Sequence, residues 1–164
     1  MSVGKLREYL MVGGLATAML GWYGPAYAGD SHARYYYPDP QTREGYASFA
    51  ETEDGAVAET RIGFTAGLNA QQHQRGYPPR YHIFAKGAHR QKLIIVAVEE
   101  NTYNTLYRLR ALLAALSSDA RVSPLFDSPD IPKDANFLDL CKILGFEQVT
   151  VSDGKTIAHR INLL

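Results

Sequence analysis

Several side chains that could carry chemistry stand close together near the end of the chain. The stretch VSDGKTIAHR, residues 151–160, contains a serine, an aspartate, a lysine, a histidine and an arginine. A serine hydrolase needs these residue types, because its nucleophilic oxygen must come within about 3 Å of a histidine base. The same letters are also typical of two strands joined by a turn. The elements that hold the residues decide between the two interpretations.

The apolar residues around this stretch favour the turn. We expect strands over residues 147–151 and 155–163, joined by a type I turn centred on Ser152 and Asp153, with Gly154 in the left-handed conformation. A two-residue turn would divide the apolar side chains between both faces of the hairpin, whereas this register gathers them on a single face. That face carries Val149, Val151, Ile157, Ile161 and Leu163.

This register excludes Ser152 as a catalytic nucleophile. His159 lies four residues beyond Lys155, about 13 Å along a strand, so Ser152 in the turn cannot reach it. Ser152 and Asp153 are expected instead to bond backbone groups of the turn. His159 points inward between Ile157 and Ile161, where it either meets a backbone carbonyl or a tyrosine, or contacts a ligand or partner.

Neither a metal site nor a cofactor is expected. The other histidines, His32, His73, His82 and His89, do not stand at metal-ligand spacing from one another or from His159. Cys141 is the only cysteine, so no intramolecular disulfide is possible, and its place on an apolar helical stripe predicts a small buried hydrophobe.

The first 28 residues have the three parts of a secretory signal peptide. Lys5 and Arg7 are followed by an uncharged, mostly apolar run from Tyr9 to Tyr23, and then by a cleavage pattern that ends at Ala28. We therefore expect residues 1–28 to be a signal peptide, or else a retained anchor facing the periplasm. The rest of the chain is expected in the periplasm.

The remaining chain divides into an arm and one domain. Residues 29–60 are acidic, tyrosine-rich and without periodicity, and we expect an irregular arm. Residues 61–164 are expected to form a single α+β domain. Strands are predicted over residues 61–68, where apolar residues recur with period two, and over residues 81–86 and 92–98, which read as a hairpin.

Two helical stripes follow the hairpin. The first is expected to begin at an N-cap at Asn101 and the second at an N-cap at Asp134, with Gly145 ending it in the left-handed conformation. The order βββααββ with short connections favours a mainly antiparallel sheet of about five strands. We predict a two-layer α+β sandwich with both helices on one face of the sheet.

Two groups of residues could bind a partner. Tyr35, Tyr36 and Tyr37 either lie across the domain's own sheet or form an aromatic patch for a partner. Residues 61–98 contain six bases and no acid. This charge either neutralises the acidic arm, or lets the hairpin around Lys86, His89, Arg90 and Lys92 dock on an acidic partner or anionic headgroups.

The domain resembles a group of small secreted proteins of alphaproteobacteria, which have no defining activity and sometimes carry the name molybdopterin-guanine dinucleotide biosynthesis protein A. The resemblance rests on RIGFTAGL, FAKG, LIIVAV, TLYRLRALLAAL, FLDLCKILGFEQVTVSDG and AHR, which lie between Arg61 and Arg160. The name implies a guanylyltransferase with a glycine-rich loop. The closest text here, VGGLATAM at residues 12–19, lacks the arginine of such a loop and lies inside the expected signal peptide, so we do not carry that activity over.

Three functions stay open. The first is a non-catalytic periplasmic interaction or accessory protein with a protein as its partner, and a membrane redox complex is one candidate for that partner. The near-neutral charge, 17 basic against 17 acidic residues, argues against general nucleic-acid binding. The second is a small-ligand-binding protein with a pocket near His159, Tyr103 and Tyr107. The third is an enzyme, either an unrecognised hydrolase or the molybdopterin guanylyltransferase that the family name implies. A close cluster of histidine, carboxylate and nucleophile would favour it.

Overall fold

The computed structural model describes residues 37–53, 56–74, 78–98, 101–122 and 131–164. These residues belong to one compact unit, residues 32–164. The element order is β1 (Thr42–Tyr46), α1 (Ala58–Gln74), β2 (Tyr81–Lys86), β3 (Lys92–Ala97), α2 (Leu106–Arg121), α3 (Phe137–Ile143), β4 (Gln148–Ser152) and β5 (Ala158–Leu163). The α+β class is confirmed. The described part has three helices rather than two, and the order βαββααββ replaces the predicted βββααββ.

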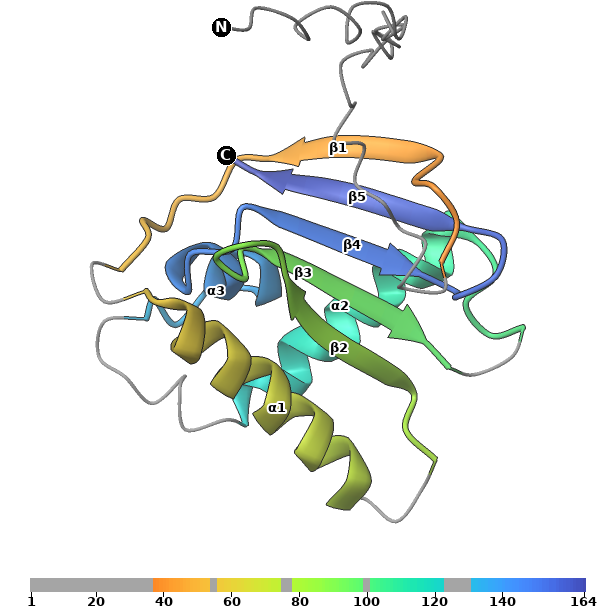
Figure 1. Cartoon of the computed structure of the whole chain (residues 1–164), viewed down its shortest axis with the longest axis horizontal. Helices are drawn as coiled ribbons and strands as arrows, with labels where there is room; N and C mark the ends of the chain where they lie inside the picture. The colour runs from red at the N-terminus through yellow and green to blue at the C-terminus, as the bar shows by residue number, and fades with distance from the viewer. Residues whose placement is uncertain (1–36, 54–55, 75–77, 99–100, 123–130) are drawn as a thin grey trace, which may run out of the picture. The chain divides into compact units, whose positions relative to one another are not determined.

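The five strands form one mixed sheet in the order β1-β5-β4-β3-β2 (Figure 1). The pairs β2–β3 and β4–β5 are antiparallel hairpins, but β3 and β4 are parallel, as are β1 and β5. The prediction of a mainly antiparallel sheet is therefore wrong. Helices α2 and α3 carry the chain back across the sheet before β4 begins, and such a crossover makes the two joined strands run in the same direction.

Residues 61–68, predicted as a strand, lie within α1. The side chains that α1 buries are Arg61, Phe64, Thr65, Leu68 and Gln72, which recur at helical spacing. Three of these five residues are polar. The apolar residues of the segment, taken alone, alternate with a period of two and so suggested a strand. The arm likewise contains β1, although it was predicted to be irregular.

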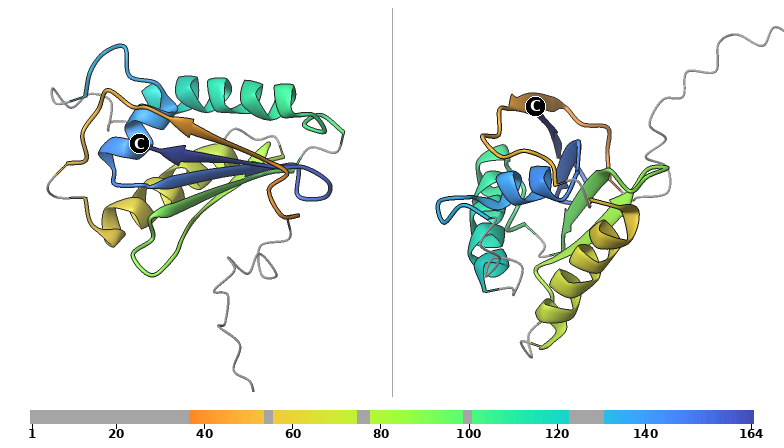
Figure 2. Two further views of the ribbon diagram at one scale, coloured as in Figure 1. Left: turned by 90° about the horizontal axis from the view of Figure 1, so that it is seen from above. Right: turned by 90° about the vertical axis from the view of Figure 1, so that its left-hand side faces the viewer.

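All three helices contribute to a core on one face of the sheet. The end-on view in Figure 2 shows the helices on one side of the line of strands. The core joins Phe64 and Leu68 of α1 to the leucines of α2, to α3 and to alternate residues of the strands, among them Leu93, Ile95, Val149, Val151 and Ile161. The gathering of Val149, Val151, Ile161 and Leu163 on one face is thus confirmed, and Ile157 packs against the same core from the loop.

Helix α1 also protects an edge of the sheet. The Asn69 side-chain amide donates to the Ile83 carbonyl at 2.8 Å and accepts from the Ile83 N–H at 3.0 Å. The side chain therefore pairs with the outer edge of β2 as a neighbouring strand would. An edge satisfied in this way is protected from pairing with another chain.

Both predicted helix N-caps lie a few residues too early. Thr105 caps α2 and Asn136 caps α3, where Asp139 completes a capping box. The prediction for Gly145 is confirmed, because its φ is 75° and the Phe146 N–H bonds the Cys141 carbonyl beyond the end of α3. A Cβ at Gly145 would also lie only 2.6 Å from the Arg61 Nη1 atom.

Candidate functional site

The β2–β3 hairpin presents the basic residues that the sequence singled out. Lys86 and Lys92 stand directly opposite each other, and His89 and Arg90 are exposed in the connecting turn. Helix α1 contacts this turn through Arg61. The Arg61 guanidinium donates to the His89 carbonyl from Nη2 at 2.7 Å and from Nε at 3.1 Å. Arg61 of α1 therefore anchors the turn that carries His89 and Arg90.

The two lysines belong to a larger basic surface on the face of the sheet opposite the helices. Strand alternation places Arg43 of β1 and Arg160 of β5 on the same face as Lys86 and Lys92. The described strands contribute no carboxylate to this face. We call the surface formed by Arg43, Lys86, Lys92 and Arg160 the basic face.

Apolar and aromatic groups accompany these cations. Phe84, on the same face, is 40% exposed. The Lys86 Nζ atom lies 5.9 Å from the centre of the Phe84 ring, and the centre of the His82 ring lies 6.3 Å from the centre of the Phe84 ring. An exposed aromatic ring is typical of a binding surface, because aromatic side chains are enriched in protein interfaces.

Of the three predicted tyrosines, only Tyr37 is described; Tyr35 and Tyr36 lie outside the described residues. Tyr37 is buried and packs with Ile94 and Ala158 at the centre of the sheet face that bears the cations. Tyr37 therefore lies across the domain's own sheet, the first of the two interpretations.

His159 lies on the helix side of the sheet and joins β1 to β5. Its ring is 2% exposed, and its Nδ1 atom lies 2.7 Å from the Thr42 hydroxyl. Its Nε2 atom lies 3.0 Å from Glu44 Oε1, an ion-pair contact whose angle is too bent for a good hydrogen bond. Its partners are thus a hydroxyl and a carboxylate, not the carbonyl or tyrosine that we expected.

Glu44 links this histidine to α2. Its second oxygen, Oε2, pairs with the Arg110 guanidinium. Partial burial acts to raise the pKa of Glu44, but the contacts with His159 and Arg110 outweigh burial and lower the pKa below its usual value. Glu44 is therefore ionised at neutral pH.

Ser152 takes no part in this cluster, as the sequence predicted. It pairs with Ala158 at the end of β4 and lies on the opposite face of the sheet from His159. Its hydroxyl donates to the Ile157 carbonyl at 2.7 Å and accepts from the Gly154 N–H at 2.9 Å. The predicted turn is too short, since the loop covers residues 153–157, but Gly154 does have a positive φ of 76°.

The Asp153 carboxylate accepts several hydrogen bonds from its own loop. Its Oδ1 atom accepts the N–H groups of Lys155, Thr156 and Ile157 at 2.8–2.9 Å, and Oδ2 accepts the Thr156 hydroxyl. Burial acts to raise the pKa of Asp153, but the hydrogen bonds, that of Thr156 foremost, lower it overall. The carboxylate form therefore stabilises the folded loop.

This loop predicts a pH-dependent stability difference. Asp153→Asn is expected to lower the free energy of unfolding at pH 7 by about 1–2 kcal/mol, because charged hydrogen bonds are stronger than neutral ones. Since folding lowers the pKa, the stabilisation is present above the unfolded value near 3.9 and is lost as the pH falls through the folded value. Urea unfolding of both proteins between pH 7 and pH 2 measures it. A difference that stays constant with pH would contradict this role.

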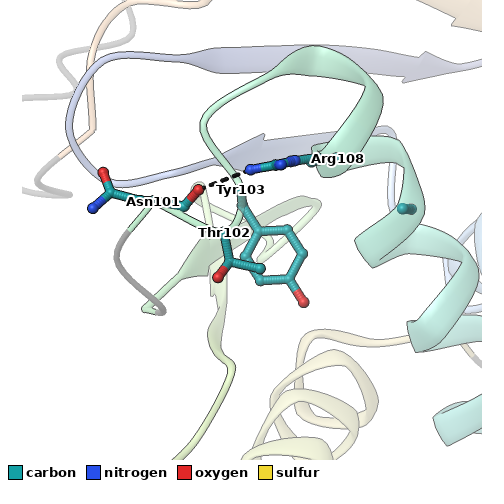
Figure 3. A pocket seen from close by; sticks show the side chains of 5 residues that line it. Asn101, Thr102, Tyr103 and Arg108 are labelled. Atoms are coloured by element: carbon teal, nitrogen blue, oxygen red, sulfur yellow. Dashed lines mark hydrogen bonds between the residues drawn. The ribbon is translucent and has the colours of Figure 1, made fainter.

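A surface hollow lies at the start of α2, as Figure 3 shows. It is lined by Asn101, Thr102, Tyr103, Arg108 and Ala111, and its volume is about 470 Å³. Arg108 donates to the Asn101 carbonyl at 3.0 Å and to Asn104 Oδ1 at 3.2 Å. The predicted ligand pocket would have joined Tyr103 to His159 and Tyr107. Neither of those two lines this hollow, and Tyr107 is 83% exposed.

Cys141 is fully buried in α3, as predicted. Burial raises the pKa of its thiol well above the ordinary value, and the neighbouring Asp139 carboxylate raises it further. The thiol is therefore a core hydrophobe and not a nucleophile at neutral pH.

The chain matches no protein family, no curated protein and no solved structure in the three comparisons. The resemblance to small secreted proteins therefore stays a prediction. Within the described residues, no three histidine, cysteine or acidic side chains are grouped so that they could hold a metal ion. In the same residues, no helix has both the length and the apolar character needed to cross a bilayer.

Proposed function

We propose that this chain is an exported interaction protein that docks on the acidic surface of a partner protein. The docking surface is the basic face together with the β2–β3 turn. An accessory subunit of a membrane-bound complex is the role that this arrangement suits, with the N-terminal segment directing the chain to the periplasm.

The observation that carries the proposal is the distribution of charge on the sheet. The described chain has both acidic and basic residues on its helix side, but the strands place cations and no carboxylate on the opposite face. Cations gathered on one face of a sheet favour the approach of an acidic surface and speed the encounter with it.

The aromatic group on this face supports a protein partner. Phe84, on the edge strand β2, adds exposed apolar area beside the cations of this face, and exposed aromatic rings are enriched in protein interfaces. The whole chain carries equal numbers of acidic and basic residues. A protein whose main ligand was nucleic acid would be expected to carry a net positive charge.

Capture from the native host tests the proposal. The protein, tagged after Leu164, is purified gently from the periplasm and from detergent-solubilised membranes, and mass spectrometry reports its N-terminus and its companions. We expect a chain that starts at Gly29, with a stoichiometric acidic companion that dissociates as the salt concentration rises. A soluble monomer with no companion at low salt would contradict the proposal.

A further inference from the structure

The cluster of Thr42, His159 and Glu44 has the composition and spacing of a nucleophile, a base and an orienting acid. Thr42 Oγ1 lies 2.7 Å from one ring nitrogen of His159, and Glu44 Oε1 lies 3.0 Å from the other. A nucleophile and base within hydrogen-bond reach, with the base oriented by a third group, is the signature of nucleophilic catalysis. Here the third group meets the base in an ion-pair contact and not in a well-angled hydrogen bond. The three residues come from two neighbouring strands, where Thr42 stands directly opposite His159.

The accessibility of the three side chains agrees with such a role. Thr42 is exposed, whereas His159 is 2% exposed. The residue that carries the hydroxyl therefore lies at the surface, and the base lies directly behind it. The register fixes this arrangement, because Thr42 and Glu44 are two residues apart on β1 and point to the same face of the sheet as His159.

The electrostatics favour the transfer of a proton to His159. The ionised Glu44 contacts Nε2, so it stabilises the positive charge that the ring acquires when Nδ1 takes a proton. Arg110 holds the other carboxylate oxygen and fixes the direction of Glu44. Glu44 is thus a positioning residue, and Thr42 and His159 are the pair that would meet the substrate.

We propose that Thr42 and His159 form an acyl-transfer site that hydrolyses small carboxylic esters at the β1 edge. Thr42 Oγ1 bonds to the ester carbonyl carbon as its proton moves to His159 Nδ1. The bond from that carbon to the alcohol oxygen then breaks, and the alcohol leaves with the proton from Nδ1. Water attacks the acyl-threonine with His159 as base, the acid is released and Thr42 recovers its proton. The net reaction is ester plus water to acid plus alcohol, and it is independent of the docking surface.

The test uses p-nitrophenyl acetate with the intact protein. We expect a burst of nitrophenol close to one equivalent, with peptide mapping that finds the acetyl group on Thr42. Thr42→Ser should retain the burst and Thr42→Val should abolish it. His159→Gln should slow acylation by roughly 10²–10⁴-fold, the contribution typical of a general base. Glu44→Gln should slow the burst without changing the site of the adduct.

A matched control removes another hydroxyl. Ser118 is exposed on α2, so Ser118→Ala should leave the burst and the adduct unchanged. Acetyl groups found only on lysines or on the N-terminus of the wild-type protein would overturn the proposal. So would a burst that survives Thr42→Val. Thermal melts of each variant confirm that the fold is retained, and the wild-type adduct map decides the question even if a variant does not fold.

Discussion

Reversing two charges on the basic face, Arg43→Glu with Lys92→Glu, is expected to weaken binding of the acidic companion about ten- to hundredfold at low salt. The two residues stand on β1 and β3, so the double variant changes the potential across most of the face. The loss should lie mainly in the association rate, because charges at the rim of an interface act chiefly on encounter. Surface plasmon resonance at several salt concentrations measures both rates.

The salt series supplies an internal check. Exposed charges are screened beyond about 10 Å at 0.1 M salt, so the affinities of the wild type and the double variant should converge as salt rises. The matched control is Lys133→Glu with Lys155→Glu. This variant makes the same change in net charge at two exposed residues outside the basic face. Equal losses in the two double variants would show that net charge, and not this surface, governs binding.

Replacement of Arg61 by methionine is expected to cost about 3 kcal/mol or more of unfolding free energy, because hydrogen bonds to charged groups contribute about 1.5–3 kcal/mol and the buried Leu144 carbonyl loses this donor. Arg61 is 6% exposed and ties three parts of the fold together. Its guanidinium donates to the His89 carbonyl in the hairpin turn and to the Leu144 carbonyl, the latter at 3.0 Å. Its contact with the end of α3 also places a positive charge at the negative end of a helix.

Urea and thermal unfolding measure this effect. Arg61→Lys keeps the charge but not the planar fork, so its loss should be intermediate. Arg80→Met removes an exposed arginine and should change stability by no more than about 0.5 kcal/mol. If Arg61→Met were as stable as Arg80→Met, the carbonyl contacts would not stabilise the fold. The same variant should also loosen the hairpin turn, so it links the stability of the core to the geometry of the basic face.

The sequence predicted the parts of the fold that depend on neighbouring residues. The hairpin at residues 81–97 and the end of α3 at Gly145 both rest on local patterns, namely alternation and left-handed glycine. The parallel pairing of β3 with β4, and of β5 with β1, could not be predicted in this way. These pairs join segments that are distant in the sequence, and hydrophobic alternation does not distinguish a parallel neighbour from an antiparallel one.

Helix α1 was missed because some of its buried residues are polar. Buried polar residues are uncommon, so a search for the core looks for apolar letters. Arg61 and Gln72 are nevertheless buried, because carbonyls, the Tyr81 hydroxyl and Asp119 satisfy their donors. Their helical spacing with Phe64 and Leu68 was present in the sequence. To detect it, a search for buried positions would have to include polar residues whose hydrogen bonds are satisfied.

The sequence predicted the position of His159 in the candidate site but not its partners. His159 was expected to point inward, and the structure confirms it, but its partners lie far away in the acidic arm. The stretch TREGY did carry a signal, because Thr42, Glu44 and Tyr46 alternate with other residues as in a strand. The place of Arg43 on the basic face could not be predicted either, because it follows only from the pairing of β1 with β5.

The most direct test of the docking surface is photo-crosslinking from one face of the domain at a time. A benzophenone amino acid replaces either Phe84, 40% exposed on the face with the cations, or Tyr107, 83% exposed on the helix side. We predict a cross-link to the acidic companion from position 84 and none from position 107. A cross-link from position 107 alone would contradict the proposed docking surface.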